Sequence, residues 1–472
     1  MRKSIVLMSD SYKLTHWPQY PKGTTKIYSY LESRGGKFDN TLFFGLQAIV
    51  KKYLIGSIVT EKDVLDAQIF CKMHFGADLF NFDGWMYIVK ELGGKLPLRI
   101  MAVPEGSLVP TGNVLMTIEN TDPKCFWLTN YVETLLMKIW YPITVATNSF
   151  YCKSEILKSM KKTGSSTDGL PFKLHDFGYR GVSSEETSEI GGMAHLVNFM
   201  GTDTISAILA ANEFYNNDEF KMYAYSVPAS EHSTMTSWGK EHELDAIMNM
   251  LDSYPEGIVS VVADSFNVYK FAESLGEEPL RSRILSRKGT FVIRPDSGDP
   301  LEVNSKLIDI LWNTFGGTYT DKGYKVLDPH IRILQGDGID YEMIQQLLHL
   351  AESKKFSPDN WVYGSGGGLL QKFDRDTQKF AIKCSYAIIN GSEVDVQKDP
   401  ITSSSKKSKK GKLKLHQSGY HFSTISSATE TEPMFNGYLD AMELVYENGE
   451  LKREQSFDEI RDISNKYLER IS

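Results

Sequence analysis

Polar and ionisable residues recur in this sequence directly after short apolar stretches, where they could do chemistry. The set comprises His175, Asp176, Arg180, Asp203, His232, Asp264, Arg294, Asp296 and Asp337. Arginine binds phosphate through its planar guanidinium group, and aspartates can hold ribose hydroxyls or a Mg²⁺ ion. These residue types therefore predict a site for a phosphorylated sugar.

Two of these motifs carry most of that prediction. Arg294, Asp296 and Asp299 fall within six positions at an expected strand end, and Asp337 is bracketed by glycines. Glycine lets the backbone lie close against a ligand. A solvated turn is the alternative for either motif alone, but the two together favour a binding site.

A glycine-rich stretch, Gly-Ser-Gly-Gly-Gly at 364–368, follows an expected strand. Consecutive glycines let backbone amides approach an anion, and a following helix would add the positive end of its dipole. The stretch predicts a phosphate site, with a tight turn as the alternative. Neither GxGxxG nor GxxxxGK[ST] fits the chain, which argues against Rossmann and P-loop nucleotide binding.

A histidine and an aspartate also lie near the ends of two expected strands. His232 follows the apolar stretch at 222–227, and Asp264 closes the next one. An aspartate that orients an imidazole is the usual arrangement for an activated histidine. A structural histidine is one alternative. A serine-hydrolase triad using Ser230 or Ser233 is another, but no GxSxG motif is present to support it.

Seven short apolar stretches, each followed by a helix-like stretch, would position these residues. They are 172–176, 196–200, 222–227, 257–264, 290–294, 331–335 and 361–364. Strands that alternate with helices predict βαβ units and a parallel sheet. Seven strands in one run favour a closed α/β barrel, with an open doubly wound sheet as the alternative. In such a barrel the carboxyl ends of the strands meet at one face, where active sites assemble.

The flanking regions predict a separate α+β unit. Strands are expected at 25–31, 98–103 and 114–118, and helices at 41–54 and 130–139. The predicted domains are an N-terminal α+β domain at 1–150, an α/β barrel at 151–388 and a C-terminal segment at 389–472. We expect the C-terminal segment to pack with the N-terminal domain and to contain a basic loop at 403–414.

Composition narrows the class of protein further. The 472 residues carry a formal net charge of -8, which does not call for a nucleic-acid partner. The N-terminus reaches Ser9 and Asp10 too soon for a signal peptide, and no apolar run approaches the ~20 residues that span a bilayer. The four cysteines form no CxxC pair that would suggest a zinc site. We expect a cytoplasmic protein.

Longer motifs resemble those of the nicotinamide phosphoribosyltransferase family, a group of type II phosphoribosyltransferases. They are HDFGYRG at 175–181, GTD at 201–203, SVPASEHS at 226–233, RPDSG at 294–298, GDG at 336–338, GSGGGLLQK at 364–372 and DSYK at 10–13. The likeness extends over essentially the whole chain. The stretch between Arg34 and Phe43 is shorter than in some relatives, which leaves that loop's conformation open.

The resemblance implies a fold, a reaction and partners. The fold is an irregular seven-stranded α/β barrel with an α+β domain formed by the N- and C-terminal segments. The reaction transfers the phosphoribosyl group of phosphoribosyl pyrophosphate (PRPP) to nicotinamide, giving nicotinamide mononucleotide and pyrophosphate in NAD salvage. Mg²⁺ is the implied cofactor and ATP a coupled co-substrate. The implied assembly is a homodimer with active sites at the subunit interface.

The same resemblance implies a role for each matching residue. Phe177 would stack on the pyridine ring, with Tyr12 of the second subunit on its other face. Asp203 would accept the amide N–H, with Ser260 and Arg294 nearby. Further sugar and phosphate contacts fall to Arg180, Asp296 (also a Mg²⁺ ligand), Gly336, Asp337, Gly366, Gly367, Arg34, Arg375, Lys383 and Lys398. His232, supported by Asp264, matches a histidine that ATP phosphorylates.

Elementary chemistry agrees with this assignment. Breaking the bond between C1 and pyrophosphate develops oxocarbenium character on the ribose and negative charge on the leaving group, which calls for carboxylates near the sugar and cations near the phosphates. Asp203 would accept from an amide and repel a carboxylate, which favours nicotinamide over nicotinate. A nicotinate phosphoribosyltransferase and a non-catalytic nucleotide sensor on the same scaffold are the alternatives.

Overall fold

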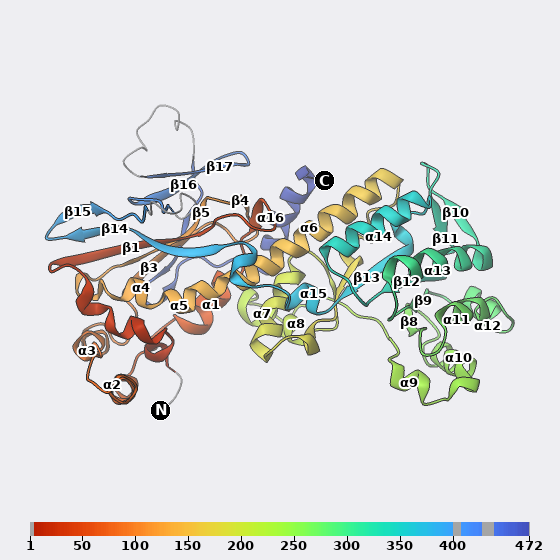
Figure 1. Cartoon of the computed structure of the whole chain (residues 1–472), viewed down its shortest axis with the longest axis horizontal. Coiled ribbons are helices and arrows are strands. Elements are labelled where there is room, and N and C mark those ends of the chain that lie inside the picture. The colour runs from red at the N-terminus through yellow and green to blue at the C-terminus, as the bar shows by residue number, and fades with distance from the viewer. Residues whose placement is uncertain (1–3, 400–406, 427–438, 472) are drawn as a thin grey trace. The chain divides into compact units, whose positions relative to one another are not determined.

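The structure of the chain is a computed structural model that describes residues 4–399, 407–426 and 439–471 (Figure 1). It divides into two compact units. Unit 1 comprises Met1–Thr147, Glu213–Asn217 and Phe373–Ser464, and unit 2 comprises Asn148–Asn212, Asp218–Lys372 and Asn465–Ser472. Each unit is therefore assembled from segments that are far apart in the sequence.

Unit 1 is built around a seven-stranded antiparallel sheet. In spatial order its strands are β15 (Ser392–Asp395), β14 (Phe380–Ile389), β1 (Thr24–Ser33), β5 (Val114–Asn120), β3 (Leu98–Ala102), β19 (Glu443–Glu447) and β20 (Glu450–Leu451). Two smaller sheets pair β2 (Asn40–Leu42) with β4 (Leu108–Pro110), and β16 (Leu413–Ser418) with β17 (His421–Ser426) and β18 (Leu439–Asp440). The strands predicted at 25–31, 98–103 and 114–118 are confirmed.

Helices pack on this sheet and complete the hydrophobic core of unit 1. They are α1 (Leu46–Tyr53), α2 (Glu61–Phe75), α3 (Phe82–Glu91), α4 (Leu128–Tyr131) and α5 (Glu133–Leu136). Trp85, Trp127 and Tyr131 meet edge to face within the core, with ring centroids 5.0 to 5.9 Å apart. The helix predicted at 41–54 is partly wrong, because β2 pairs with β4 before α1 begins.

A buried carboxylate ties together distant parts of unit 1. Glu105 accepts the backbone N–H of Gly45 at 2.9 Å, the backbone N–H of Gln47 at 2.7 Å and the hydroxyl of Tyr215 at 2.8 Å. Burial raises the pKa of Glu105, against the three donors that lower it. The carboxylate thus depends on each donor for its stability in the core.

This dependence predicts a contrast between two buried tyrosines. Tyr215→Phe removes one donor from the Glu105 carboxylate and should cost about 1–3 kcal/mol of stability. Tyr363→Phe should be neutral or stabilising, because the buried Tyr363 hydroxyl has no hydrogen-bond partner among the described residues. Urea denaturation of both variants measures the difference, and equal losses would contradict the assigned role of Tyr215.

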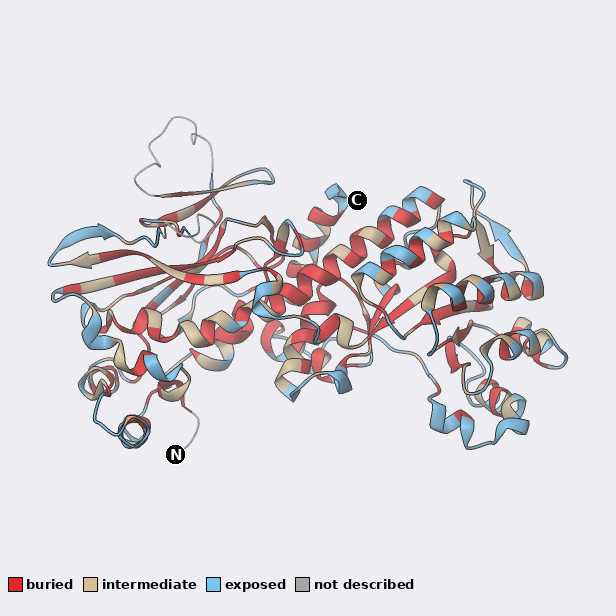
Figure 2. Cartoon of the chain, viewed as in Figure 1, coloured by how far each residue is buried: buried red, intermediate tan, exposed pale blue. Residues whose placement is uncertain are grey.

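Unit 2 is built around a six-stranded parallel sheet that curls on itself. In spatial order its strands are β7 (Gly201–Thr202), β6 (Leu174–Asp176), β13 (Trp361–Ser365), β12 (Ile331–Gln335), β9 (Phe291–Arg294) and β8 (Val259–Val262). A separate hairpin of β10 (Gly317–Tyr319) and β11 (Lys325–Leu327) contacts α13. The strands are mostly buried (Figure 2), as parallel strands covered by crossover helices are.

The remaining helices connect these strands. Those within unit 2 are α7 (Glu185–Leu196), α9 (His232–Thr236), α10 (Glu243–Ser253), α11 (Val268–Ser274), α12 (Leu280–Leu285), α13 (Pro300–Phe315), α14 (Tyr341–Ser353) and α15 (Gly367–Leu370). Three others, α6 (Trp140–Thr163), α8 (Ile205–Tyr215) and α16 (Phe457–Ile471), begin in one unit and end in the other. Helix α13 shows how the sequence specifies such a helix. Asp299 caps its first turn, and apolar residues recur on the face that the helix buries.

Two of the seven predicted strands differ in the structure. The stretch 196–200 is not a strand, because α7 continues to Leu196 and β7 begins only at Gly201. The stretch 222–227 forms no named strand. Instead, isolated parallel bridges join Tyr225 to Gly201 and Ala229 to Ser260, so this segment reaches both edge strands of the sheet.

Some expectations concern the ends and loops of the chain. The predicted barrel range of 151–388 includes most of β14, which pairs with β1 in unit 1. Part of the basic loop predicted at 403–414 lies outside the described residues, and its end belongs to β16. No helix in the described part of the chain has the length and apolar character needed to span a membrane.

Candidate active site

The predicted site residues of unit 2 lie at the carboxyl edge of the parallel sheet. Parallel register aligns β6 with β13 and β7, and β12 with β9 and β13. Phe177, Asp203, Asp296 and Asp337 each follow a strand of this sheet. Because these strands end at the same edge, the structure brings the four residues to one mouth.

Phe177 lies at the centre of this mouth. A Cβ atom added to Gly364 would lie 2.0 Å from Phe177 Cε2, so the ring needs a glycine on β13. A Cβ atom on Gly336 would lie 3.6 Å from the same atom. The backbone N–H of Phe177 donates to the Ser365 carbonyl at 2.9 Å. The aromatic ring therefore lies close against the backbone of Gly364 on β13 and near Gly336 after β12.

Asp203 lies at the same mouth, directly after β7. Its backbone N–H donates to the Asp176 carbonyl at 2.9 Å, and its Oδ1 accepts the hydroxyl of Ser226. The side chain is exposed. Ser226 thus holds one carboxylate oxygen and leaves the other able to accept an N–H from a ligand. The sequence did not identify Ser226, whose segment was expected to be a strand.

Two ionisable residues of β6, the strand beside β7, are buried. Burial lowers the pKa of His175, with Asp203 opposing, so the imidazole is neutral near pH 7. Burial raises the pKa of Asp176 to about 6, and the Gly178 N–H, which donates to its Oδ1 at 2.7 Å, lowers it in part. The ionised form of Asp176 is therefore disfavoured by burial, while its Oδ1 holds the turn after β6.

The Asp176 pKa predicts a pH-dependent stability. A carboxyl with an ordinary pKa of 3.8 and a folded pKa of about 6 favours the fold when protonated, and this contribution is lost as the pH rises through 6. Asp176→Asn keeps the acceptor for Gly178 and cannot ionise. Its stability relative to the natural protein should therefore grow by about 3 kcal/mol between pH 4 and pH 8. Denaturation at several pH values measures this gain, and a constant difference would contradict it.

An apolar cavity of about 430 Å³ lies within unit 2 beside these residues. Its lining includes His175, Ser226, Ser260, Val292 and Leu334. Ser260, Val292 and Arg332 are register partners on β8, β9 and β12, and Leu334 lies two residues after Arg332, so these lining residues share one face of the sheet. The buried hydroxyl of Ser260 makes no hydrogen bond to a described residue, and it is available to a ligand in the cavity.

The arginine and aspartates after β9 and β12 divide into different roles. Arg294 ends β9 and is half-buried, and its Nε makes no hydrogen bond to a described residue. Asp296 lies near Gly336, where an added Cβ atom would be 3.5 Å from its Oδ1. Asp299 caps α13, because its Oδ1 accepts the Glu302 N–H at 2.8 Å. Asp296 is the carboxylate of this motif that lies beside the turn after β12.

The glycine-rich turn after β13 lies beside the turn after β6. A Cβ atom added to Gly366 would lie 3.4 Å from the Phe177 carbonyl oxygen. One added to Gly181 would lie 3.6 Å from the Gly367 nitrogen. The helix expected after this turn is only four residues long, so its dipole adds little. Any anion site here would depend on the backbone amides and on Arg180, which is exposed on the neighbouring turn.

His232 and Asp264 form the pair that the sequence predicted. His232 Nε2 lies 2.9 Å from Asp264 Oδ1. The His232 side chain is 48% exposed and that of Asp264 only 7%, so a fixed carboxylate orients an accessible ring. Nδ1 of His232 is left as the nitrogen that can react with a ligand.

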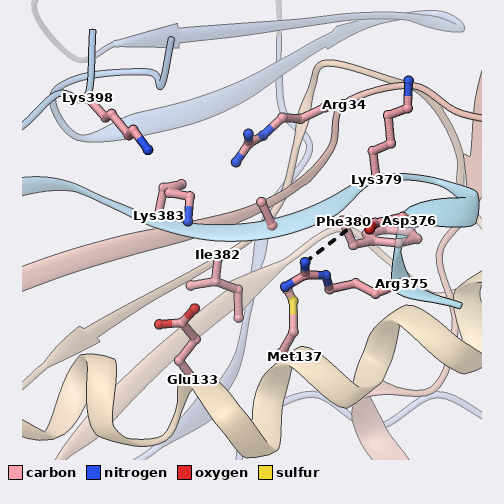
Figure 3. Close-up of a pocket in the computed structure, with 11 residues that line it drawn as sticks. Arg34, Glu133, Met137, Arg375, Asp376, Lys379, Phe380, Ile382, Lys383 and Lys398 are labelled. Atoms are coloured by element: carbon pink, nitrogen blue, oxygen red, sulfur yellow. Dashed lines mark ion pairs between the residues drawn. The ribbon is translucent and has the colours of Figure 1, made fainter. Parts of the chain in front are cut away.

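The four cations that the sequence predicted line one cavity in unit 1. This cavity of about 520 Å³ lies on β14, and Arg34, Arg375, Lys383 and Lys398 surround it together with Lys379 (Figure 3). Burial lowers the pKa of Lys383, and the neighbouring Arg34, Lys398 and Arg375 lower it further, against Glu133. The lining therefore carries five cationic side chains against the two carboxylates of Glu133 and Asp376, an excess of positive charge that would attract an anion.

Tyr12, the remaining predicted residue, belongs to unit 1. It is 58% exposed, with its ring 4.7 Å from that of His16. Lys379 and the cavity residues Val292 and Leu334 were not identified from the sequence. The alternation of inward positions along each predicted strand could have found the last two.

Solved structures define the class of this fold. The chain is similar to the nicotinate-nucleotide pyrophosphorylase from Pyrococcus furiosus, with a TM-score of 0.62, 14% identity and coverage of 100% of this chain and 98% of that chain. It is also similar to human nicotinic acid phosphoribosyltransferase, with a TM-score of 0.56, 16% identity and coverage of 99% and 94%. The mixed α/β fold with its curled parallel sheet is that of the type II phosphoribosyltransferases.

Sequence relatives then identify the family. Residues 172–445 match the nicotinate phosphoribosyltransferase (NAPRTase) family, and residues 4–100 match the nicotinamide phosphoribosyltransferase N-terminal domain. The nicotinamide phosphoribosyltransferase of Xanthomonas campestris pv. campestris is 47% identical, with 97% of each chain covered. That of Acinetobacter baylyi is 33% identical, with 98% of this chain and 97% of the relative covered. The chain belongs to the nicotinamide phosphoribosyltransferase family.

Proposed function

We propose that the protein transfers the phosphoribosyl group of PRPP to nicotinamide, giving nicotinamide mononucleotide and pyrophosphate in NAD salvage. The observation that carries this proposal is Asp203, an exposed carboxylate after β7 whose Oδ1 accepts from Ser226, a residue that lines the apolar cavity. An exposed carboxylate acceptor beside an apolar cavity suits a neutral pyridine carboxamide and disfavours a carboxylate.

The pyridine needs positioning more than activation. Its ring nitrogen is a neutral nucleophile that requires no strong base, so orientation supplies the main advantage. Phe177 would stack on the ring, and the Ser260 hydroxyl and Arg294 would contact the carboxamide together with Asp203. Tyr12 of a second subunit would close the other face. The neutral His175 adds no charge that would attract nicotinate instead.

The ribose and phosphates need charged groups. Asp296 and Asp337 would hold the ribose hydroxyls as positive charge develops at C1, with Gly336 letting the sugar approach the backbone. Arg180 would meet the pyrophosphate, and the amides of Gly366 and Gly367 the 5′-phosphate. Arg34, Arg375, Lys383 and Lys398 would supply further cations.

A Mg²⁺ ion fits this set of donors. The described residues contain no group of three or more His, Cys, Asp or Glu side chains that could hold a metal by themselves. Mg²⁺ commonly keeps its waters and binds one or two carboxylates together with substrate phosphates, which a single Asp296 satisfies. When bound, the ion would neutralise charge on the departing pyrophosphate.

We also propose the features that the family implies around this reaction. ATP would phosphorylate His232 and couple its hydrolysis to the transfer. The segment that bridges β7 and β8 would complete a seven-membered barrel. The enzyme would act in the cytoplasm as a homodimer whose active sites combine residues of both subunits.

The homodimer predicts complementation between inactive variants. Asp203 belongs to unit 2 and Arg375 to unit 1. The variants Asp203→Ala and Arg375→Ala should each be inactive alone. If each site takes these two residues from different chains, refolding an equal mixture should restore about a quarter of the natural activity through heterodimers. No recovery in the mixture would assign both residues to the same chain.

A comparison of the two pyridines tests the acceptor. We expect kcat/KM for nicotinamide to exceed that for nicotinate by a factor of about 10² or more. Preference for nicotinate would make the protein a nicotinate phosphoribosyltransferase, and binding of PRPP without turnover of either pyridine would make it a nucleotide sensor.

A further inference from the structure

A buried asparagine on α13 joins the two loops that carry Asp296 and Asp337. Asn304 has no exposed surface. Its Nδ2 donates to the Pro300 carbonyl at 2.8 Å and to Gln335 Oε1 at 2.7 Å, and its Oδ1 accepts from Trp361 Nε1 at 2.9 Å. An indole N–H can only donate and a carbonyl can only accept, so the orientation of the Asn304 amide is fixed.

The fixed Asn304 amide also determines the orientation of the Gln335 amide. Gln335 ends β12, and it is 2% exposed. Because its Oε1 accepts from Asn304, its Nε2 is left to donate to the backbone carbonyl of Asp337, at 2.8 Å. Donation therefore runs in one direction from Trp361 through Asn304 and Gln335 to Asp337.

The network runs from Trp361, the first residue of β13, to the turn after β12 and the start of α13. Pro300 is the first residue of α13 and comes four positions after Asp296. Helix α13 packs beside β12, next to β13 (Figure 1). Gly338, with φ of +69°, lets the chain turn immediately after Asp337. The buried amides thus fix the backbone on which both carboxylates are carried.

We propose that Asn304 and Gln335 are positioning residues that set the spacing of Asp296 and Asp337 and so the affinity for PRPP. Neither side chain reaches the mouth itself, since both are buried among α13, β12 and β13. Loss of either amide leaves buried partners without hydrogen bonds, and the Asp337 turn relieves this by moving. The inference rests on the proposed function only in taking PRPP as the ligand of these carboxylates.

Asn360 provides a matched control in the same unit. It also has no exposed surface and makes three hydrogen bonds, from Leu327 N at 2.7 Å and to the carbonyls of Lys325 at 2.9 Å and Ser357 at 2.8 Å. Asn360 immediately precedes Trp361, but its own hydrogen bonds go to residues 325, 327 and 357 and to no member of the network. Both Asn304→Ala and Asn360→Ala should lower stability, but their effects on the substrate should differ.

Steady-state kinetics of the full chain tests the proposal. We expect Asn304→Ala to raise KM for PRPP by about tenfold or more, with a smaller change in KM for nicotinamide, and Asn360→Ala to leave the ratio of the two KM values unchanged. Gln335→Met removes only the hydrogen bonds at the end of the network and should give the same selective increase in KM for PRPP. This variant tests the proposal if Asn304→Ala does not fold. Equal changes in both KM values, or the same change in the control, would overturn the proposal.

Amide hydrogen exchange gives a second result that does not depend on turnover. Exchange at residues 336–338 should become faster in Asn304→Ala and Gln335→Met but not in Asn360→Ala. Unchanged exchange in the first two variants would overturn the network. Failure of the natural protein to use PRPP, with exchange behaving as expected, would instead contradict the proposed function alone.

Discussion

Asp203→Asn should lower kcat/KM for nicotinamide by about tenfold to a hundredfold and should narrow or reverse the preference over nicotinate. Ser226 donates to Oδ1 of the aspartate, so Oδ1 of the asparagine would take that hydrogen bond. The Nδ2 group would then face the substrate. It would oppose the N–H₂ of nicotinamide but could donate to the carboxylate of nicotinate.

A matched loss of charge elsewhere provides the control. Asp245, on α10, is exposed and pairs with His242 at 2.7 Å. Asp245→Asn changes the net charge by the same amount and should leave both kcat/KM values unchanged. An unaltered ratio of the two pyridines in Asp203→Asn would show that Asp203 does not read the carboxamide.

His232→Ala should abolish labelling of the protein by the γ-phosphate of ATP. Asp264 binds Nε2, so Nδ1 would attack the γ-phosphorus, the bond to ADP would break, and ADP would leave as the Nε2 proton remains shared with Asp264. Some ATP-independent transfer should survive, because the proposed pyridine site does not include His232. Asp264→Asn should weaken the label without removing the nitrogen that accepts it.

His242 is a close control for that experiment. It pairs with Asp245 at 2.7 Å as His232 does with Asp264, but both members of the pair are more than 60% exposed. His242→Ala should be labelled like the natural protein. Label that persists in His232→Ala, or disappears in His242→Ala, would place the phosphorylation elsewhere.

Much of unit 2 could be predicted because its signals are local. Apolar runs such as 331–335 fill buried positions in a parallel sheet, and the polar residue that follows each strand marks the mouth. The exceptions also have local causes. The stretch 196–200 was predicted as a strand because an apolar run does not distinguish a buried helix end from a strand, but Leu196 is the last residue of α7. Within the stretch 222–227, only Tyr225 forms a bridge to a strand.

The roles of polar residues were harder to predict, because they depend on distant partners. Asp299 and Asp296 are alike in the sequence, yet one caps α13 and the other remains at the mouth. Ser226 gained its importance only when the chain brought it to Asp203, 23 residues away. Asn304 and Gln335 look like ordinary polar residues of a helix and a strand until the fold buries them together.

The most direct test of the central claim is to detect nicotinamide mononucleotide formed by the purified protein. The reaction contains PRPP, Mg²⁺ and nicotinamide, with and without ATP, and chromatography with mass detection follows the products. We predict equal amounts of nicotinamide mononucleotide and pyrophosphate from the natural protein, and a large loss in Asp203→Asn. No product under either condition, from protein that still binds PRPP, would contradict the account.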